Sequence, residues 1–405
     1  MRHKNTLITI AAGFFALNAT TWAGGFQLYN EGSAEALAQA GAITARDDLS
    51  SLAWYNPAGL AGTEQRSVMV GNTFILLNAR FDGSAFNDTM GKHWRSIPHA
   101  YLIQPINKTQ TFTLSLNAPY GLITEWPDGW NGQPLAIKSE LSSLYATPSL
   151  AMKLSEQLSV SAGFNAVYTT VELTSLAVPL ALGGRDPNIA VPQQRKLSAN
   201  DFGIGGTVAL RWAINPHWAL GARYQSEVQH TFDGKAQYAS DPDVKFKADG
   251  TLPDSLTLGL TYTGLERWTF GLDAVWTDWS DFDQLVYEFP GANETVPEEW
   301  NDVWSIHLGA EFRASKNWVL RGGYVRDESP VSGQYRSPML PGSDSQLFMG
   351  GFGYTFKSWT LDVAYSYILA EKTEQGSAIA ATDPAFAGDY DSDAHLLSFS
   401  ISHSF

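Results

Sequence analysis

In the stretch "HLLSFSISHSF", residues 395–405, every second residue from Ser398 to Ser404 is a serine, and large side chains alternate with these serines. One face carries Leu397, Phe399, Ile401, His403 and Phe405, and the other carries serines. Side chains of a β-strand point alternately to its two faces, so this period of two predicts a strand.

The same alternation recurs from about Arg66 onward, for example at 111–117, 158–168 and 359–367. A soluble sandwich and a membrane barrel would both produce it. The runs extend over roughly 10 to 20 residues, whereas an ordinary strand has about 5–6 and a strand crossing a membrane needs about 9–11. Run length therefore favours a transmembrane barrel.

The connections between runs alternate between short turns and long loops, which is typical of outer-membrane barrels. The long loops are expected near 81–91, 119–136, 176–200, 238–252, 281–299, 329–344 and 371–391. Fourteen antiparallel strands are predicted, near 66–80, 93–106, 109–118, 137–153, 158–175, 201–213, 217–237, 253–263, 267–280, 300–314, 318–328, 345–356, 359–370 and 393–405.

Tryptophans recur where a short turn meets the next strand, at positions 218, 268, 318 and 359. Core tryptophans would not lie so regularly beside turns. We therefore expect an aromatic girdle at the membrane interface on the side of the short turns.

Composition narrows the function classes. The formal net charge of −15 argues against a nucleic-acid partner. The chain has no cysteine, which excludes disulfides and thiolate chemistry. We find no Ser-His-Asp spacing, phosphate loop or histidine pair at metal spacing, so we predict no enzyme, no catalytic residue, no cofactor and no metal site.

The N-terminal part differs from the rest. Residues 1–23 have a basic start, a short apolar run and a small residue at Ala23, as a signal peptide does. Residues 24–65 lack strand alternation and are too few for a separate domain. They include a predicted short helix at Ala34–Ala40 and the irregular "SSLAWYNPAGL", residues 50–60. We expect 24–65 to form a plug inside a barrel of residues 66–405.

The segment "GGFQLYNEGSAEALAQAGAITARDDLSSLAWYNPAGL", residues 24–60, resembles the N-terminal hatch of the FadL-type outer-membrane transporters of long-chain fatty acids and hydrocarbons. "NAPYGLITEW" at 117–126 and "GFNAVY" at 163–168 carry the same resemblance. It implies a 14-stranded all-β barrel in the outer membrane of a Gram-negative bacterium, with a small helical plug in its lumen.

The resemblance implies passive uptake of hydrophobic small molecules, long-chain fatty acids in particular. Extracellular loops would capture the substrate, an internal pocket would hold it, and a gap near the third strand would release it sideways. The implied gating residues are Gly24, Gly25 and Phe26 at the mature N-terminus and Asn56, Pro57 and Ala58, which match a hatch triplet near that strand. Pro119, just beyond the third strand, suits a broken ladder.

The loop at 176–184 is strongly apolar, and exposed apolar patches usually bind something. We expect a landing site with Leu176, Val178, Leu180 and Leu182 on one wall and Trp126 and Trp130 on the other. Packing of the two walls against each other is the alternative, and both can hold together.

The chain departs from the fatty-acid members at 169–177, which contains Glu172 but no lysine or arginine. A buried carboxylate needs a partner. Lumen-facing Arg211, Arg223, Arg313 and Arg321 could supply it, or could pair with Glu227, Asp273, Glu311 or Asp362. Neutral aromatic or aliphatic hydrocarbons are therefore the alternative substrate.

Two other classes stay open at this stage: an outer-membrane enzyme, for which His99, His230 and His307 would be the histidines, and a general diffusion porin, which would not need a plug. The expected partners are the hydrophobic substrate, outer-membrane lipids and lipopolysaccharide, and the barrel-insertion machinery, which would read Phe405. A lateral exit favours a monomer.

Overall fold

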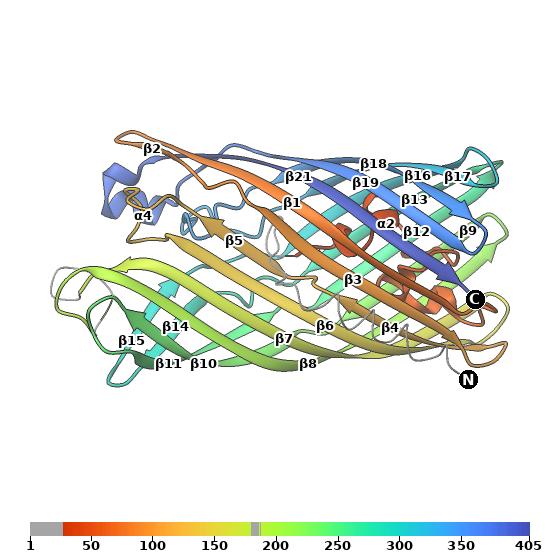
Figure 1. Ribbon diagram of the computed structural model, residues 1–405, viewed down its shortest axis with the longest axis horizontal. Coiled ribbons are helices and arrows are strands. Elements are labelled where there is room, and N and C mark those ends of the chain that lie inside the picture. The colour runs from red at the N-terminus through yellow and green to blue at the C-terminus, as the bar shows by residue number, and fades with distance from the viewer. Residues whose placement is uncertain (1–26, 180–185, 187) are drawn as a thin grey trace.

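The chain forms a closed antiparallel β-barrel with a small plug in its lumen, in a computed structural model that describes residues 27–179, 186 and 188–405 (Figure 1). Each crossing strand pairs with its neighbour along the chain. The last strand, β21 (Gly388–Ser404), pairs with the first, β1 (Ser67–Gly83), from Ser67↔Ser404 to Gly83↔Gly388. This pairing closes the wall and leaves the sheet without a free outer edge.

Fourteen strands cross, as predicted. Nine are continuous: β1, β3 (Trp94–Pro105), β6 (Lys138–Lys153), β7 (Leu158–Ala177), β8 (Gln193–Asn215), β17 (Trp318–Asp327), β18 (Ser345–Phe356), β19 (Trp359–Ala370) and β21. Five are interrupted: β4 (Gln110–Asn117) with β5 (Gly121–Glu125), β9 (Trp218–Gln225) with β10 (Val228–Tyr238), β11 (Val244–Leu252) with β12 (Ser255–Leu265), β13 (Trp268–Thr277) with β14 (Gln284–Phe289), and β15 (Ala292–Pro297) with β16 (Val303–Arg313). Short β2 (Asn87–Thr89) and β20 (Thr373–Glu374) add to β1 and β21.

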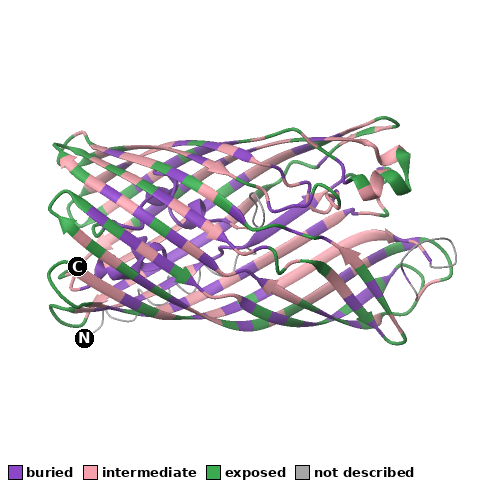
Figure 2. Ribbon diagram, turned by 180° about the vertical axis from the view of Figure 1, so that it is seen from behind, coloured by how far each residue is buried: buried purple, intermediate pink, exposed green. Residues whose placement is uncertain are grey.

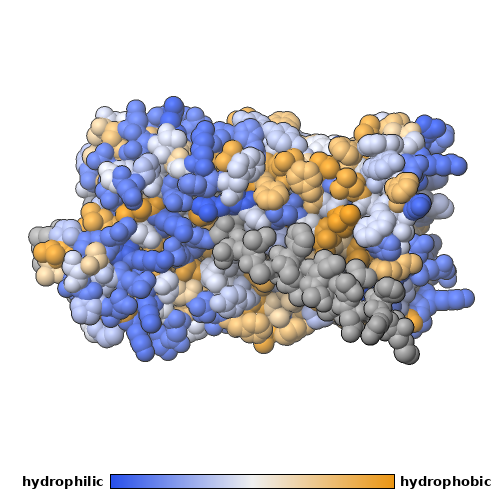
Figure 3. Space-filling model, in the orientation of Figure 1, coloured by the Kyte–Doolittle hydropathy of each residue, from blue (hydrophilic) through white to orange (hydrophobic). Residues whose placement is uncertain are grey.

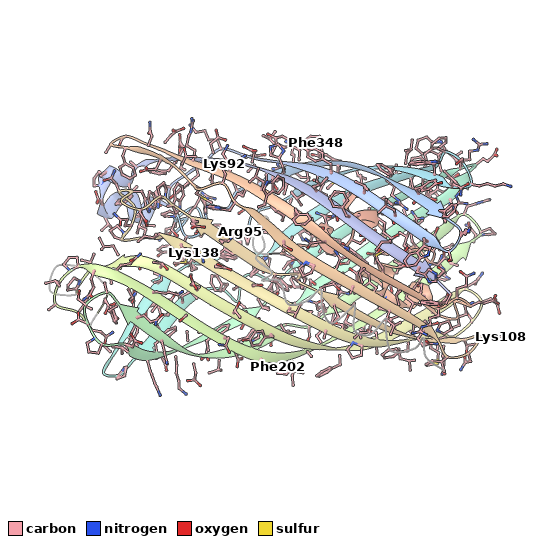
Figure 4. The ribbon with its side chains drawn as sticks, viewed as in Figure 1. Lys92, Arg95, Lys108, Lys138, Phe202 and Phe348 are labelled. Atoms are coloured by element: carbon pink, nitrogen blue, oxygen red, sulfur yellow. The ribbon has the colours of Figure 1, made fainter. Side chains whose placement is uncertain are left out.

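A band of large apolar side chains surrounds the barrel. Phe202, Ile204 and Phe348 are 59%, 60% and 48% exposed, and Figure 4 shows Phe202 and Phe348 pointing away from the wall on opposite sides. Orange side chains occupy the middle of the molecule in Figure 3, between blue ends. So much exposed apolar surface is stable against lipid and not against water.

The predicted tryptophan girdle is confirmed. Trp218, Trp268, Trp318 and Trp359 each begin a strand directly after a short turn, and each is between 39% and 47% exposed. Trp359 pairs with His403 near the C-terminus, so these strand starts lie at the end of the barrel where the C-terminus is marked in Figure 1. That end therefore faces the periplasm, and the long loops lie at the extracellular end.

Several predicted loops contain strand residues, and two of them are mainly strand. Residues 238–252 contain β11, and residues 281–299 contain the hairpin of β14 and β15. These strands reach beyond the lipid, so their outward side chains, such as Lys245 and Lys247, are polar. The sequence analysis recognised strands by their apolar outward side chains, so it missed these strands, whose outward side chains are polar.

The plug consists of short turns: η2 (Asn30–Gly32), α2 (Ala34–Leu37), α3 (Leu52–Tyr55) and η3 (Pro57–Leu60). The predicted helix at Ala34–Ala40 ends at Leu37, and the backbone reverses at Ala40 and Gly41, both at positive φ. Figure 2 shows the buried plug enclosed by the wall. One further helix, α4 (Ser377–Thr382), and the turn η5 (Pro384–Phe386) lie in an extracellular loop. In the described chain no helix has the length and apolar character that crossing a membrane would require.

A row of inward-facing glycines provides the surface on which the plug lies. Gly221, Gly271, Gly309 and Gly323 lie on β9, β13, β16 and β17. A Cβ at any of them would come within 2.7 Å of a backbone atom of residues 39–44. Gly323 packs against the plug, whereas its neighbour Gly322 does not, since a Cβ there would meet only Met349 O at 3.9 Å.

Candidate functional site

An apolar cavity lies inside the extracellular half of the barrel. Its walls surround about 1030 Å³ of space outside the protein atoms, part of which is open to solvent. Its apolar lining comes from seven elements and the adjoining loops, and includes Leu173, Leu197, Phe232, Phe246, Leu252, Trp279, Phe282, Leu285, Tyr287 and Trp300. The chemistry of this lining fits a hydrophobic molecule.

Polar groups at the margin of the cavity are engaged with one another. His230 contacts Thr169 Oγ1 through Nε2 at 3.0 Å and Asp201 through Nδ1 at 3.1 Å. His99 lies elsewhere, 2.9 Å from Ser400 Oγ, and His307 contacts Ala40 O at 2.7 Å. Each of these histidines has a structural partner in the wall or the plug, and among the described side chains none forms a Ser-His-Asp arrangement.

One side of the cavity reaches an open strand edge. The ladder between β11 and β14 contains the pair Lys247↔Glu288. Residues 248–252 have no partner on β14 among the described strand pairs, and all of them line the cavity. Consecutive residues of β11, whose side chains point to opposite faces of the strand, all line the cavity. The cavity therefore reaches into the barrel wall at this place.

A long loop between β17 and β18 closes the cavity from above. Ser337, Met339 and Leu340 line it. Thr124 Oγ1 donates to Met339 O at 2.9 Å, which ties the loop to β5. Arg336 stabilises the loop from within by donating from Nε to Gly342 O at 2.8 Å. Burial lowers the pKa of the Arg336 guanidinium.

Tyr120 and Trp279 mark the lower end of the cavity. Trp279 lines it, and its ring centroid lies 6.1 Å from that of Tyr120. Tyr120 is fully buried and donates its hydroxyl to Pro253 O at 3.1 Å. Tyr120 belongs to the break between β4 and β5, so the floor of the cavity meets the broken third strand.

The third strand leaves an interruption in the wall. Residues 94–99 of β3 pair with β1, while β5 pairs with β6. No ladder joins residues 94–99 to β5 among the strand pairs of the described chain. The ion pair of Arg95 with Glu125 at 2.9 Å spans the extracellular end of this interruption. The ladder break expected at Pro119 is present.

The plug touches the same break. Leu28 N donates to Pro119 O at 2.7 Å, and Gln27 forms an isolated bridge with Tyr120. Gly24, Gly25 and Phe26 lie outside the described residues, as do residues 1–23. The first described residue after them, Gln27, is therefore in contact with the broken strand.

The triplet Asn56, Pro57 and Ala58 joins the plug to the wall at β8. Asn56 Nδ2 donates to Thr44 O at 2.7 Å and to Leu210 O on β8 at 2.9 Å, and its Oδ1 accepts from Ala58 N. η3 packs on β6, β7 and β8, and α3, directly before the triplet, contacts β3 and also β4, which belongs to the third strand. Proline at the first position of η3 fits because its missing N–H is not needed there.

The luminal arginines have different partners. Arg321 pairs with Glu311 at 2.8 Å and with Asp362, as the sequence allowed. Plug residue Arg46 joins the same Glu311 at 3.0 Å, and Arg211 pairs with Asp47 of the plug at 2.7 Å. These buried and half-buried charges tie the plug to β8, β16, β17 and β19.

The predicted landing residues that are described lie at the extracellular end. Trp126 and Trp130 stack with centroids 4.4 Å apart, and both are buried. Leu176 N donates to Gln133 O at 2.8 Å, so the end of β7 contacts the loop that carries Trp126 and Trp130. Of the described candidates, none of Trp126, Trp130, Leu176 and Val178 lines the cavity. Leu180 and Leu182 lie outside the described residues.

Comparison with known proteins identifies the family. The sequence model of the outer membrane protein transport protein family (OMPP1/FadL/TodX) matches residues 15–405. The chain belongs to this family. The long-chain fatty acid transport protein of Escherichia coli O6:H1 is 26% identical over 431 residues, covering 93% of this chain and 95% of that protein. Outer membrane protein P1 of Haemophilus influenzae is 23% identical over 305 residues, covering 68% of this chain and 66% of that protein.

Solved structures of the FadL/TodX family share the fold. A Pseudomonas aeruginosa FadL homologue has a TM-score of 0.80 at 18% identity, covering 96% of this chain and 99% of that one. The toluene transporter TodX of P. putida has a TM-score of 0.74 at 17% identity, covering 93% and 98%. The chain is thus an outer-membrane β-barrel of a transport family. Among its described residues, no group of three or more His, Cys, Asp or Glu side chains could hold a metal ion.

Proposed function

We propose that this barrel takes up hydrophobic small molecules, long-chain fatty acids in particular, by passive diffusion across the outer membrane. The observation that carries the proposal is the apolar cavity above a plugged lumen, whose floor meets a break in the wall at Tyr120. A greasy solute gains from leaving water for such a cavity, whereas a water-filled pore offers it no apolar path.

The route has three steps in this proposal. Loops at the extracellular end, with Trp126, Trp130 and the apolar loop 176–184, receive the substrate. The cavity then holds it against Phe232 and Phe246. Movement near the plug's N-terminus, at Gly24 to Phe26 and Gln27, opens the path past Tyr120, and the substrate leaves sideways between β3 and β5.

The triplet Asn56, Pro57 and Ala58 supports the plug that forces this sideways exit. Asn56 joins the plug turn at Thr44 to the wall at Leu210. Because the plug blocks the axis of the barrel, a substrate that reaches Tyr120 finds the interrupted wall as the nearest exit.

Neutral aromatic or aliphatic hydrocarbons are the second candidate substrate. The stretch 169–177 has no lysine or arginine, and Glu172 in it already pairs with Lys138 and Lys196. The names of relatives include both substrate classes: a long-chain fatty acid transport protein in Escherichia coli and a toluene transporter in P. putida.

The decisive experiment measures uptake of labelled oleate and labelled toluene by cells with and without the gene. Faster uptake of either compound with the gene supports the proposal, and their ratio ranks the substrates. Equal uptake of both compounds with and without the gene would refute it. A small hydrophilic solute of similar mass serves as the control for a general diffusion porin, which would pass it.

The remaining partners follow from the same proposal. A monomer is expected, since a lateral exit must face lipid. The outward band contacts outer-membrane lipids and lipopolysaccharide. Phe405, at the end of β21 and half exposed, is the residue we expect the insertion machinery to recognise.

A further inference from the structure

One luminal arginine has no counter-ion. Arg223 on β9 is only 4% exposed, and among the ion pairs of the described chain it takes part in none, unlike Arg46, Arg195, Arg211 and Arg321. Its Nη2 donates to Gln225 Oε1, and its Nε has no hydrogen-bond partner. A buried charge without a partner is unfavourable, so the site is incomplete as it stands.

Aromatic side chains surround this guanidinium. Its Cζ lies 4.3 Å from the ring centroid of Trp54, a plug residue in α3. The tyrosines whose hydroxyls act electrostatically on it are Tyr29, Tyr55, Tyr120 and Tyr145. Aromatic faces stabilise a cation but leave its N–H donors unsatisfied. The surroundings therefore hold the charge in place and keep it available to an anion.

A second unpaired donor lies beside the same plug residue. Tyr145 on β6 is 1% exposed, and its hydroxyl has no partner. The Tyr145 ring lies 5.9 Å from the Trp54 ring on which Arg223 packs. A carboxylate has two acceptor oxygens, which can take one bond from the guanidinium and one from the hydroxyl.

Arg223 and Tyr145 lie next to the proposed route of the substrate. Tyr120 separates it from the cavity: the Tyr120 ring is 6.1 Å from Trp279, which lines the cavity, and 6.0 Å from Tyr145. A molecule with its tail in the cavity and its head below Tyr120 would bring a carboxylate to Arg223. The head would then touch Trp54 of the plug.

We propose that Arg223, assisted by Tyr145, is the carboxylate-recognising site of this transporter, and that it makes long-chain carboxylic acids the preferred substrate over hydrocarbons. This inference rests on the proposed uptake function and names its substrate class. It assigns recognition to β9 and to the plug-facing lumen, away from the stretch 169–177 where the sequence has no basic residue.

The test compares an acid with a neutral ligand of equal chain length. Purified full-length protein is titrated with hexadecanoate and with hexadecan-1-ol, and binding is followed by tryptophan fluorescence and by displacement of a labelled ligand. Wild type should prefer the acid. Arg223→Met should weaken binding of hexadecanoate by roughly tenfold or more, because a charged hydrogen bond is lost, and should leave hexadecan-1-ol within about twofold.

Matched variants separate recognition from plug support. Tyr145→Phe removes a hydroxyl that has no partner in the free protein, so the fold should be unchanged while acid affinity falls a few-fold. Arg211→Met removes another luminal cation, one paired with Asp47, and should not change the ratio of acid to alcohol affinity. Heat-modified migration on gels shows whether the barrel is folded. Protease resistance of residues 27–60 shows whether the plug is docked.

Three results would overturn the inference. Equal losses for acid and alcohol in Arg223→Met would mean that Arg223 only supports the plug. An unchanged preference in both Arg223→Met and Tyr145→Phe would place recognition elsewhere. If wild type binds neither ligand and cells take up neither, the proposed function itself fails, which the uptake assay detects independently.

Discussion

Tyr120 connects the plug, the cavity and the wall. It bridges to Gln27 of the plug, donates to Pro253 O and lies near Trp279 and Tyr145. Tyr120 belongs to "NAPYGLITEW", one of the stretches that resemble the FadL-type transporters. The alternation of apolar and polar residues in that stretch does not distinguish a tyrosine at a break in the strand from an ordinary strand residue. Its role follows only from the contacts.

At the residue scale, Asn56→Ala tests the plug anchor. The change removes three bonds, those to Thr44 O and Leu210 O and the one accepted from Ala58 N, and leaves these groups with fewer partners. A loss of about 1–3 kcal/mol in plug docking is expected. Uptake of labelled oleate should fall, while the barrel keeps its heat-resistant migration on gels.

Replacement of all of Asn56, Pro57 and Ala58 should have the same effect, only larger. Asn293→Ala, at an exposed position on β15, is the matched control and should change neither readout. Normal uptake in the triplet variant would show that the gate lies elsewhere.

Also at the residue scale, Phe246→Ala tests capture in the cavity. Phe246 is 5% exposed, lines the cavity and packs near Tyr287 and Phe289. Loss of a large apolar surface should reduce ligand affinity by roughly tenfold, measured as a higher substrate concentration for half-maximal uptake. Phe348→Ala, which faces lipid, is the control. An equal effect of both changes would mean that the cavity does not hold the substrate.

At the scale of elements, the glycine row explains how a plug of short turns stays in place. Each turn is too short to be stable alone. Stability comes from close backbone contact with β9, β13, β16 and β17 and from the ion pairs around Glu311. The sequence alone does not tell which of two adjacent glycines, such as Gly322 and Gly323, faces inward.

Gly323→Ala tests this arrangement. The added Cβ would lie 2.7 Å from Ala40 N, which forces the plug to move, whereas the Cβ of Gly322→Ala would meet Met349 O at 3.9 Å. We expect a rise in ion conductance in planar bilayers and faster proteolysis of the plug for Gly323→Ala alone. Identical behaviour of the two neighbours would contradict the close contact.

At the scale of the whole molecule, the sequence predicts the barrel well because lipid imposes one rule on every crossing strand. Outward side chains must be apolar, as at Phe202 and Phe348, and tryptophans follow the short turns before β9, β13, β17 and β19. Where strands leave the lipid, as at β11 and β14, this rule no longer applies and the prediction failed.

The candidate site was less predictable because it depends on contacts between distant segments. The break at Pro119 could be expected from proline chemistry. The absence of a counter-ion at Arg223 and the wall contact of Asn56 with β8 depend on how the plug lies, and no local pattern encodes that.

The central claim is that the substrate leaves sideways through the break between β3 and β5. Three residues, 118 to 120, separate Asn117 from Gly121, whereas two residues separate their partners Tyr145 and Ser142 on β6. Deletion of Pro119 makes the two counts equal and should allow β4 and β5 to form one unbroken strand, with Tyr120 still facing inward. Pro119→Ala keeps the extra residue and serves as the control.

The most direct measurement is the rate of oleate uptake by the Pro119 deletion, with oleate binding by the purified protein measured in parallel. Our account predicts that binding is retained within a few-fold while uptake falls to the level of cells without the gene, and that Pro119→Ala stays close to wild type. Uptake at the wild-type rate by the deletion, in a barrel shown to be folded, would contradict lateral release.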